Sequence, residues 1–285
     1  MKRKSIAGKI CLITGAGSGI GKDVAIVAAR RGARLVLTSQ TPAKLEATVS
    51  DIRRLGGEVL YSEAVDIASY EAVHTFAKEV TERFGAVDIL INVAGISLWG
   101  AAERLDYARW RKPIDINLFG TIHFIENFIP QMVSAGKGGH VVNVSSAAGM
   151  LGMPLHAAYS ASKYGIVGMT DVLYIDLKPH GINVSLVCPG AVRTPIMDST
   201  EVVGATEESR QKFRKVFDRI AIPSSKAAES IVSGIEKNRY MIYTNFDIRI
   251  LYLIKTNAPI LYRFLMVTAG KYLRRFTVAT EEARY

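Results

Sequence analysis

Short hydrophobic runs recur along the chain and alternate with segments whose hydrophobic positions follow the helical period. The runs lie at residues 9–14, 34–38, 58–65, 87–92, 140–145, 183–188 and 241–244. Short, continuous runs of this kind are typical of strands that are covered on both faces. The segments between them, at about 22–33, 41–56, 69–84, 103–135 and 156–179, have the length and the period of helices. Strands that alternate with helices predict right-handed βαβ units and a parallel sheet.

Glycine and capping residues predict where several of these helices begin and end. Gly32 follows the first helical segment and is a typical stop residue. Thr41 precedes Pro42, which is the usual order of an N-cap and a first helical position. Ser69 is placed to cap the next helix, which Gly85 is expected to end.

The composition fits a single large folded domain. Of the 285 residues, 49% are hydrophobic and 22% are charged, close to the average of globular proteins. This excludes a disordered chain and a small disulfide-stapled protein. We expect one doubly wound α/β domain over residues 1–240, with a parallel sheet of about seven strands and helices on both faces. Residues 241–285 are expected to add the last strand and a basic, aromatic-rich, amphipathic C-terminal extension to the same domain.

Cysteine usage and the termini bear on the compartment. Cys11 and Cys188 both lie in apolar runs, so we expect buried free thiols and a reducing, cytoplasmic environment. The five histidines lack metal-binding spacing, and no metal site is expected. Lys9 and the nearby glycines interrupt the apolar segment that a signal peptide needs. No uncharged apolar stretch is long enough for a conventional spanning helix.

A glycine-rich segment, TGAGSGIG at residues 14–21, joins the first predicted strand to the first helix. Glycines allow a tight turn and a close approach of the backbone to a phosphate group. The N-terminus of the following helix offers free N–H groups and a partial positive charge to an anion. Because the segment opens a βαβ series, we interpret it as a nucleotide-binding loop rather than as a structural turn.

Tyr159 and Lys163 are four residues apart in a predicted helix and therefore share one face. An ammonium group beside a phenol favours the phenolate and would lower the tyrosine pKa from its usual value of about 10, making it a usable general acid or base. Such pairs also occur by chance on surface helices. Ser146 makes this pair informative, because it ends a predicted strand at the carboxyl edge of the sheet, where open α/β folds bind ligands.

These motifs resemble those of the short-chain dehydrogenase/reductase family. The resemblance rests on the TGxxxGxG spacing of the loop, on NVAG at 92–95, on Asn117 and Ser146, on the pair Tyr159 and Lys163, and on Pro189-Gly190. It is strong over about residues 6–195 and weak beyond them. It implies a Rossmann-type fold, hydride transfer with NAD(P)(H) and a substrate lid at about 191–222. Val93 is one departure, since the family more often has a second Asn there.

The resemblance also implies roles for individual residues. In the implied catalytic set, Tyr159 exchanges the proton and Ser146 hydrogen-bonds the substrate oxygen. Lys163 lowers the tyrosine pKa and holds the nicotinamide ribose, and Asn117 anchors a relay water. Ser145 is then structural. The residues implied to contact the cofactor are Gly15, Ser18, Gly19, Ile20, Gly21, Ser39, Gln40, Asp66, Ile67, Asn92, Ala94, Gly95, Tyr159, Lys163, Pro189, Gly190, Val192 and Thr194.

The end of the second predicted strand bears on the choice between NAD and NADP. An acidic residue there binds the adenosine ribose of NAD, whereas its absence together with a basic group suits the 2′-phosphate of NADP. Neither Ser39 nor Gln40 is acidic, and the arginine common in NADP-dependent relatives is missing too. Lys22 and Lys44 are near in sequence. Because a carboxylate would repel the phosphate, its absence favours NADP(H) over NAD(H).

The net charge of +10 is concentrated toward the C-terminus, where residues 237–285 hold nine Lys or Arg and three acidic residues. Nine of the 24 aromatic residues also lie from Tyr240 onward. A basic amphipathic helix with aromatic residues can lie in a membrane interface. Peripheral membrane contact, a wall for a bulky substrate, and packing against the body or a second subunit are therefore alternatives for the extension. Nucleic acid is disfavoured, because no recognition motif is present.

Together these features predict an oxidoreductase that transfers a hydride between NADP(H) or NAD(H) and a secondary alcohol or ketone. Apolar residues in the lid and the extension indicate a lipophilic small-molecule substrate of a steroid-like, long-chain or acyl kind, as in lipid metabolism. A 3-oxoacyl thioester reductase is the alternative within this class, and a non-catalytic redox sensor or scaffold is the alternative outside it. Relatives are usually dimers or tetramers, so a homo-oligomer is expected, cytoplasmic or peripherally attached to a membrane.

Overall fold

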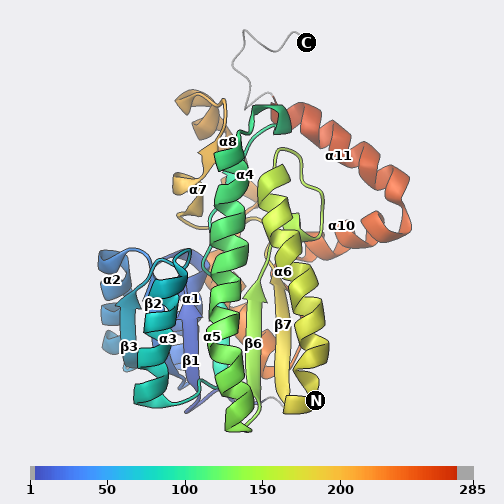
Figure 1. Cartoon of the computed structure of the whole chain (residues 1–285). Coiled ribbons are helices and arrows are strands. Elements are labelled where there is room, and N and C mark those ends of the chain that lie inside the picture. The colour runs from blue at the N-terminus through green and yellow to red at the C-terminus, as the bar shows by residue number, and fades with distance from the viewer. Residues whose placement is uncertain (1–3, 275–285) are drawn as a thin grey trace.

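The computed structural model describes residues 4–274, which include a seven-stranded parallel sheet (Figure 1). From one edge to the other, its strands are β11 (Met241–Tyr243), β7 (Ile182–Cys188), β6 (Gly139–Val144), β4 (Ile89–Asn92), β1 (Ile10–Thr14), β2 (Arg34–Ser39) and β3 (Glu58–Ala64). All seven predicted strands are confirmed. The chain winds outward from β1 in both directions, so the carboxyl ends of β1 and β4 form the switch point at which such sheets bind ligands.

Helices cover both faces of the sheet, as predicted (Figure 1). Side chains alternate along β1, so Cys11 and Ile13 enter one buried cluster and Leu12 enters the other. The first cluster includes side chains of α1 (Gly19–Arg30), α2 (Pro42–Arg54) and α9 (Ser224–Glu236). The second includes side chains of α3 (Tyr70–Phe84) and α5 (Gly120–Ala135), beside which α6 (Ala157–Asp176) completes the layer. Cys11 and Cys188 are buried free thiols, as predicted.

The predicted helical segment 103–135 is divided in the structure. It begins with a short 3-10 turn, Ala102–Arg104, and continues as α4 (Tyr107–Pro113), a π-helical segment (Ile114–Phe119) and α5. Pro113 lacks an N–H group, which weakens the regular hydrogen-bond pattern just before the π-helical segment. The capping predictions also differ in detail. Ser69 accepts a hydrogen bond from the Ala72 N–H, whereas the Thr41 side chain occupies the N-cap position without a capping bond.

Small elements surround the carboxyl ends of the strands. The pair β5 (Leu98–Trp99) and β9 (Glu201–Val202) joins the loop after β4 to the predicted lid, and β8 (Val192–Arg193) pairs with β10 (Ile222–Pro223). Two helices, α7 (Ile196–Ser199) and α8 (Glu207–Ile220), lie between these strands, and a 3-10 turn occupies Ala147–Gly149 after β6. Another 3-10 turn, Lys178–His180, lies at the opposite edge of the sheet, just before β7. The predicted lid segment 191–222 therefore forms a structured excursion beside the switch point.

After β11 the chain forms an arm of two helices, α10 (Phe246–Asn257) and α11 (Pro259–Arg274), which projects from the body (Figure 1). Its inner side packs against the body through Ile248 and Tyr262. In the part of the chain that is described, no helix is both long and apolar enough to cross a membrane. The division of the domain at residue 240 stays a prediction, and the last residues of the predicted extension, 275–285, lie outside the described residues.

Candidate active site

The glycine loop lies against three other segments of the predicted site. A Cβ atom on Gly15 would be 2.9 Å from Cα of Ala94, and one on Gly19 would be 3.0 Å from Cβ of Thr194. Both glycines have a positive φ, at +69° and +54°. Gly21 packs so closely on the loop that a Cβ atom would lie 2.2 Å from the Gly15 carbonyl oxygen. Only glycine fits at these positions, so the loop brings β1, β4 and the segment after β7 together.

The start of α1 has the donor groups that an anion needs. Ser18 is the N-cap residue in extended conformation, and its side chain makes no capping bond, so it leaves the first N–H groups of the helix without this partner. No acidic residue lies in the first turn of α1. The narrow glycine cradle and the helix N-terminus therefore fit the pyrophosphate of a dinucleotide. Gly15, Ser18, Gly19, Ile20 and Gly21, which were predicted from sequence, all lie here.

The loop after β4 is fixed from both sides. The Thr14 hydroxyl accepts hydrogen bonds from the Val93 and Ala94 N–H groups, each at 3.0 Å. A Cβ atom on Gly95 would meet Asn117 Oδ1 at 2.8 Å, which places this loop beside the predicted catalytic set. The Asn92 side chain bonds within the sheet, where its Nδ2 donates to Asn143 Oδ1 on the neighbouring strand.

Asn117 lies in the π-helical segment, and its side chain is fully buried. Its Oδ1 accepts from the Ile96 N–H at 2.8 Å, and its Nδ2 donates to the Ile96 carbonyl and to Ser162 Oγ. The Ser162 hydroxyl in turn donates to the Tyr159 carbonyl at 2.7 Å. Irregular helical turns of this kind are frequent at functional sites. Here the π-helical segment holds the asparagine against α6.

Ser146 and Tyr159 meet at the carboxyl end of β6. Their side chains form a hydrogen bond, which favours the phenolate, but burial is the larger effect and raises the pKa of Tyr159. This net direction differs from the lowering predicted from the spacing of Tyr159 and Lys163. Ser145 is structural, as expected, because its hydroxyl donates to the Lys163 carbonyl at 2.8 Å.

The burial and position of Lys163 explain why it does not lower the pKa of Tyr159. Its side chain is buried, and burial lowers its pKa to about 8. Its Nζ donates to the Val144 carbonyl at 3.0 Å and lies 5.9 Å from the centre of the Tyr159 ring. The ammonium group is thus held at the end of β6 and beside Gly95, near the tyrosine but not against its hydroxyl.

The sequence offered two lysines, Lys22 and Lys44, near the end of β2, and their positions in the structure differ. Lys22 forms an ion pair with Asp51 at 2.7 Å. Lys44 lies next to the glycine loop, since a Cβ atom on Gly17 would be 2.5 Å from Ser39 Oγ and 3.2 Å from Lys44 Cβ. Gln40 Nε2 donates to Asp66 Oδ2 at 3.3 Å, so the predicted adenosine-side residues lie together. Ile67, which follows Asp66 in the chain, is buried and packs against Gly120.

The segment after β7 carries the residues predicted to meet the nicotinamide. The Pro189 carbonyl accepts from the Ala147 N–H at 2.7 Å, which ties this segment to the turn after Ser146. Val192 is buried in the small β8–β10 sheet, and Thr194 lies beside Gly19.

Sequence reasoning missed two residues that fix this site. Asn245 accepts from the Gly190 N–H and donates to the Ala191 carbonyl. Its position just after the last strand was the available signal, because the ends of parallel strands gather at one edge. Ser162, which bonds Asn117, lies three residues after Tyr159, and this helical spacing was its signal.

An aromatic cluster lies beside Tyr159. The ring centroid of Trp99 is 3.8 Å from that of His156 and 4.6 Å from that of Phe213 in α8. His156 lies 5.7 Å from the Tyr159 ring and therefore borders the reactive phenol. Burial lowers the pKa of His156 to about 4, and its Nδ1 donates to the Pro154 carbonyl, so the imidazole is neutral near pH 7.

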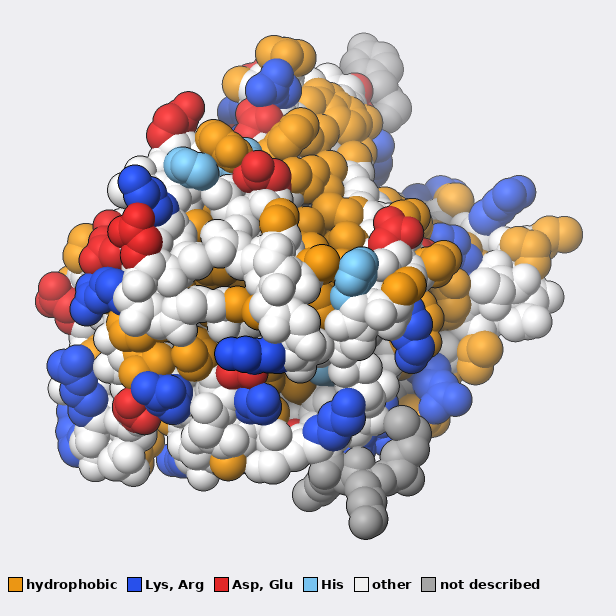
Figure 2. All heavy atoms as spheres, turned by 60° about the horizontal axis from the view of Figure 1, so that its bottom comes forward, with side chains coloured by type: hydrophobic (Ala, Val, Ile, Leu, Met, Phe, Trp, Pro, Cys, Tyr) orange, Lys and Arg blue, Asp and Glu red, His pale blue; other side chains and the backbone are white. Residues whose placement is uncertain are grey.

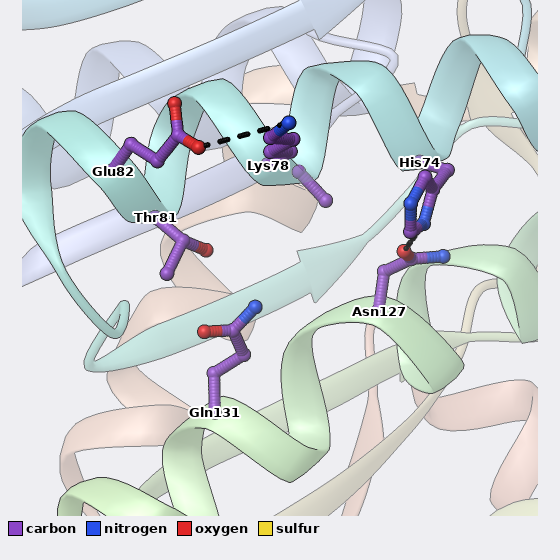
Figure 3. Close-up of a pocket in the computed structure, with 7 residues that line it drawn as sticks. His74, Lys78, Thr81, Glu82, Asn127 and Gln131 are labelled. Carbon is purple, nitrogen blue, oxygen red and sulfur yellow. Dashed lines mark hydrogen bonds and ion pairs between the residues drawn. The ribbon is translucent and has the colours of Figure 1, made fainter.

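A separate hollow lies between α3 and α5 (Figure 3). It is bordered by long polar side chains, including His74 and Lys78 of α3 and Asn127 and Gln131 of α5. His74 Nδ1 lies 2.8 Å from Asn127 Oδ1, and Lys78 pairs with Glu82. None of the predicted site residues lines this hollow, so it is distinct from the candidate active site.

Comparison with known proteins agrees with this geometry. The sequence profile described as short chain dehydrogenase matches residues 9–202. The chain belongs to the short-chain dehydrogenase family. It is 32% identical over 249 residues to SadH, a putative oxidoreductase of Mycobacterium tuberculosis, and the match covers 86% of this chain and 89% of SadH.

Solved structures share this fold over most of the chain. A member from Burkholderia phymatum in complex with NAD has a TM-score of 0.82 and 28% identity, over 90% of this chain and 96% of that one. A variant of actinorhodin polyketide ketoreductase with NADPH has a TM-score of 0.73 and 29% identity, over 83% of this chain and 95% of that one. The protein is therefore an oxidoreductase of this family that uses NAD or NADP.

Proposed function

We propose that this short-chain dehydrogenase transfers a hydride between NADP(H) and the carbonyl or carbinol carbon of a lipophilic ketone or secondary alcohol. The observation that carries the proposal is the arrangement at the switch point. Ser146, Tyr159, Lys163 and Asn117 lie at one end of the sheet, and Gly95 joins the lysine and the asparagine to the nucleotide cradle.

Each residue of this set has a role that its surroundings support. When bound, the nicotinamide supplies or accepts the hydride. Tyr159 donates a proton to the substrate oxygen in the reducing direction, and its raised pKa keeps the phenol protonated near neutral pH. Ser146 hydrogen-bonds the same oxygen. Lys163 holds the nicotinamide ribose, and Asn117, fixed by Ile96 and Ser162, anchors the water of the proton relay.

The aromatic cluster supports a lipophilic substrate. Trp99 and Phe213 are buried apolar groups that adjoin Tyr159 through His156, and the neutral His156 adds no charge to this wall. A charged substrate would lose its hydration there without a compensating partner. A steroid-like, long-chain or acyl carbonyl compound suits this wall better than a small polar one, and the acyl case includes 3-oxoacyl thioesters.

Two observations support NADP(H) over NAD(H). The end of β2 carries Ser39 and Gln40 rather than an acidic residue, and Lys44 lies next to Ser39 and the glycine loop. The Lys44 ammonium group can therefore pair with the 2′-phosphate that distinguishes NADP.

Assembly and location are further parts of the proposal. We propose a cytoplasmic homodimer or homotetramer that touches a membrane surface through its C-terminal arm. Exposed apolar residues on α6, among them Val172 and Ile175, support an interface between copies, and those of α10 and α11 support the membrane contact. The buried free thiols of Cys11 and Cys188 support a reducing compartment.

The test is turnover of the Tyr159→Phe variant. We expect the absorbance of NADPH to fall when ketones graded from short-chain to steroid-sized are added to the natural protein, with the larger ones preferred. Without the phenol proton, Tyr159→Phe should lose at least about a hundredfold in kcat and still bind NADPH. Tyr174→Phe, an exposed tyrosine of the same helix, is the control. Undiminished turnover by Tyr159→Phe would contradict the proton transfer assigned to Tyr159, whereas NADPH binding without turnover by the natural protein would favour the non-catalytic sensor.

A further inference from the structure

The arm formed by α10 and α11 has two unlike sides. Its inner side is committed to the body, since Ile248 and Tyr262 are buried in a cluster with Met150 and Leu151 of the loop that follows Ser146. Lys255 donates to the Met150 carbonyl and to the Tyr164 hydroxyl. The arm is therefore a fixed part of the fold rather than a loose tail.

The outer side of the arm is apolar and has no partner in the described chain. Phe246, Ile260 and Phe264 are 74%, 82% and 68% exposed. Helical spacing places them with other exposed residues on one side of each helix. We call this surface the outer face and define it by Phe246, Leu253, Ile260, Leu261, Phe264 and Val267. Exposure of so many large apolar side chains on two neighbouring helices marks an interaction surface.

The charges around the outer face are almost all positive. Between residues 246 and 274 the sequence has five basic residues and one acidic residue, Asp247. Lys255 points to the body, and Arg274 pairs with Glu103, which leaves Arg249, Arg263 and Lys271 exposed along the arm. Hydrophobic and basic side chains share the lobe at the right-hand edge of Figure 2, where the arm projects from the body.

The apolar side chains and the positive charges together indicate which kind of partner the outer face binds. A second copy docked face to face would bring two surfaces of the same positive charge together, and like charges across an interface are unfavourable. A substrate is disfavoured too, because the reacting residues lie on the inner side, behind the loop that Ile248 and Tyr262 cover. An anionic bilayer complements both properties, since its acyl region takes the apolar side chains and its headgroups pair with the cations.

We propose that the outer face of α10 and α11 docks this protein on the surface of an anionic lipid bilayer. The arm lies in the interface and does not cross it. Because its inner side packs on the loop after Ser146, docking holds the candidate active site close to the lipid surface. Resting on the proposed function, this geometry gives the enzyme access to lipophilic carbonyl compounds dissolved in the membrane.

The experiment is co-sedimentation of the full-length protein with vesicles of phosphatidylcholine, with or without phosphatidylserine. We expect binding only when phosphatidylserine is present, and weaker binding as salt is added. The double variant Arg263→Gln/Lys271→Gln should bind at least about tenfold more weakly, since each cation near the surface contributes about fivefold. Phe264→Ser/Val267→Ser should weaken binding to a similar degree. Arg53→Gln/Lys78→Gln, two exposed cations elsewhere, should bind like the natural protein.

Two outcomes would overturn the proposal. One is equal sedimentation with both kinds of vesicle and for all variants. The other is a lower molar mass in solution for Phe264→Ser/Val267→Ser with vesicle binding unchanged, which would assign the outer face to a second copy. Turnover of a steroid-sized ketone, measured on every variant without vesicles, separates this test from the proposed function. Its absence in all proteins would contradict the proposed reaction and leave the vesicle result intact.

Discussion

At the residue scale, we expect Ser39 to influence which cofactor binds at the end of β2. It lies 2.5 Å from the position of a Cβ atom on Gly17, so any side chain at residue 39 faces the nucleotide loop. A carboxylate there would repel a 2′-phosphate and accept hydrogen bonds from a ribose diol. We expect Ser39→Asp to change the ratio of kcat/KM for NADPH and NADH at least about tenfold toward NADH.

The control for this prediction is Ser50→Asp, which adds the same charge to an exposed position of α2. Initial rates with each cofactor at limiting concentration give the ratio directly. A ratio that moves equally in both variants would contradict the assignment of Ser39, because a general effect of negative charge would then suffice. Lys44→Ala should lower kcat/KM for NADPH and leave kcat/KM for NADH unchanged.

Burial of Lys163 makes the stability of the whole fold depend on pH. Burial lowers the pKa of this amine to about 8, from its usual value of 10.5. Between these values the unfolded chain holds a proton that the folded protein has released, so the free energy of unfolding rises with pH there. The stability difference between the natural protein and Lys163→Met should thus grow in favour of the natural protein from pH 8 to 10.5, by about 3 kcal/mol at most.

Urea unfolding of both proteins across this pH range checks the prediction. Other groups titrate in both proteins, so they cancel in the difference. Lys78→Met, at an exposed lysine, should show no such trend. A flat difference for Lys163→Met would mean that the buried amine keeps its proton throughout, through its bond to the Val144 carbonyl.

At the element scale, the start of α1 depends on a glycine whose surroundings and backbone both exclude a side chain. Gly19 has φ +54°, and a Cβ atom there would lie 3.0 Å from Thr194. Gly56 also has a positive φ, but a Cβ atom would meet open space. Both Gly19→Ala and Gly56→Ala should cost about 1 kcal/mol of stability through backbone strain.

Only Gly19→Ala should weaken cofactor binding, by about tenfold or more, because the loop and the Thr194 segment must move apart. Titration of NADPH fluorescence measures the dissociation constants, and thermal unfolding measures the strain. Equal affinity in both variants would show that the close approach of Gly19 to Thr194 plays no part in holding the cofactor.

The elements that the sequence predicted well are those whose signals are local. The seven strands are continuous apolar runs, and the Tyr159–Lys163 pair and the glycine loop have fixed spacing within one element. Pro113 was a local signal for a break in this helix, but the position of Asn117 in the π-helical segment was not predictable. Its partners, Ile96 and Ser162, are far from it in the sequence. The raised pKa of Tyr159 was missed for the same reason, since burial is a property of the assembled site.

At the scale of the whole molecule, α6 carries both the catalytic pair and a second exposed apolar face. Tyr164, Gly168, Val172 and Ile175 share one side of this helix. Val172 and Ile175 are 55% and 69% exposed, and a Cβ atom on Gly168 would meet nothing. Such a face can pack against the same face of a second copy around a two-fold axis, with the glycine allowing a close approach of the helices.

We therefore expect the interface of the homo-oligomer to lie on α6, and the outer face of the arm to stay available for lipid. The double variant Val172→Glu/Ile175→Glu should therefore lower the molar mass in solution by at least half, because four like charges would be buried at a two-fold interface. Light scattering after size-exclusion chromatography measures the mass, and Leu55→Glu, at a similarly exposed leucine, is the control. If the mass stays unchanged while Phe264→Ser/Val267→Ser lowers it, the two surfaces have the opposite roles. Because Lys163 lies on this same helix, a monomeric variant that loses turnover as well would further show that assembly supports the catalytic face of α6.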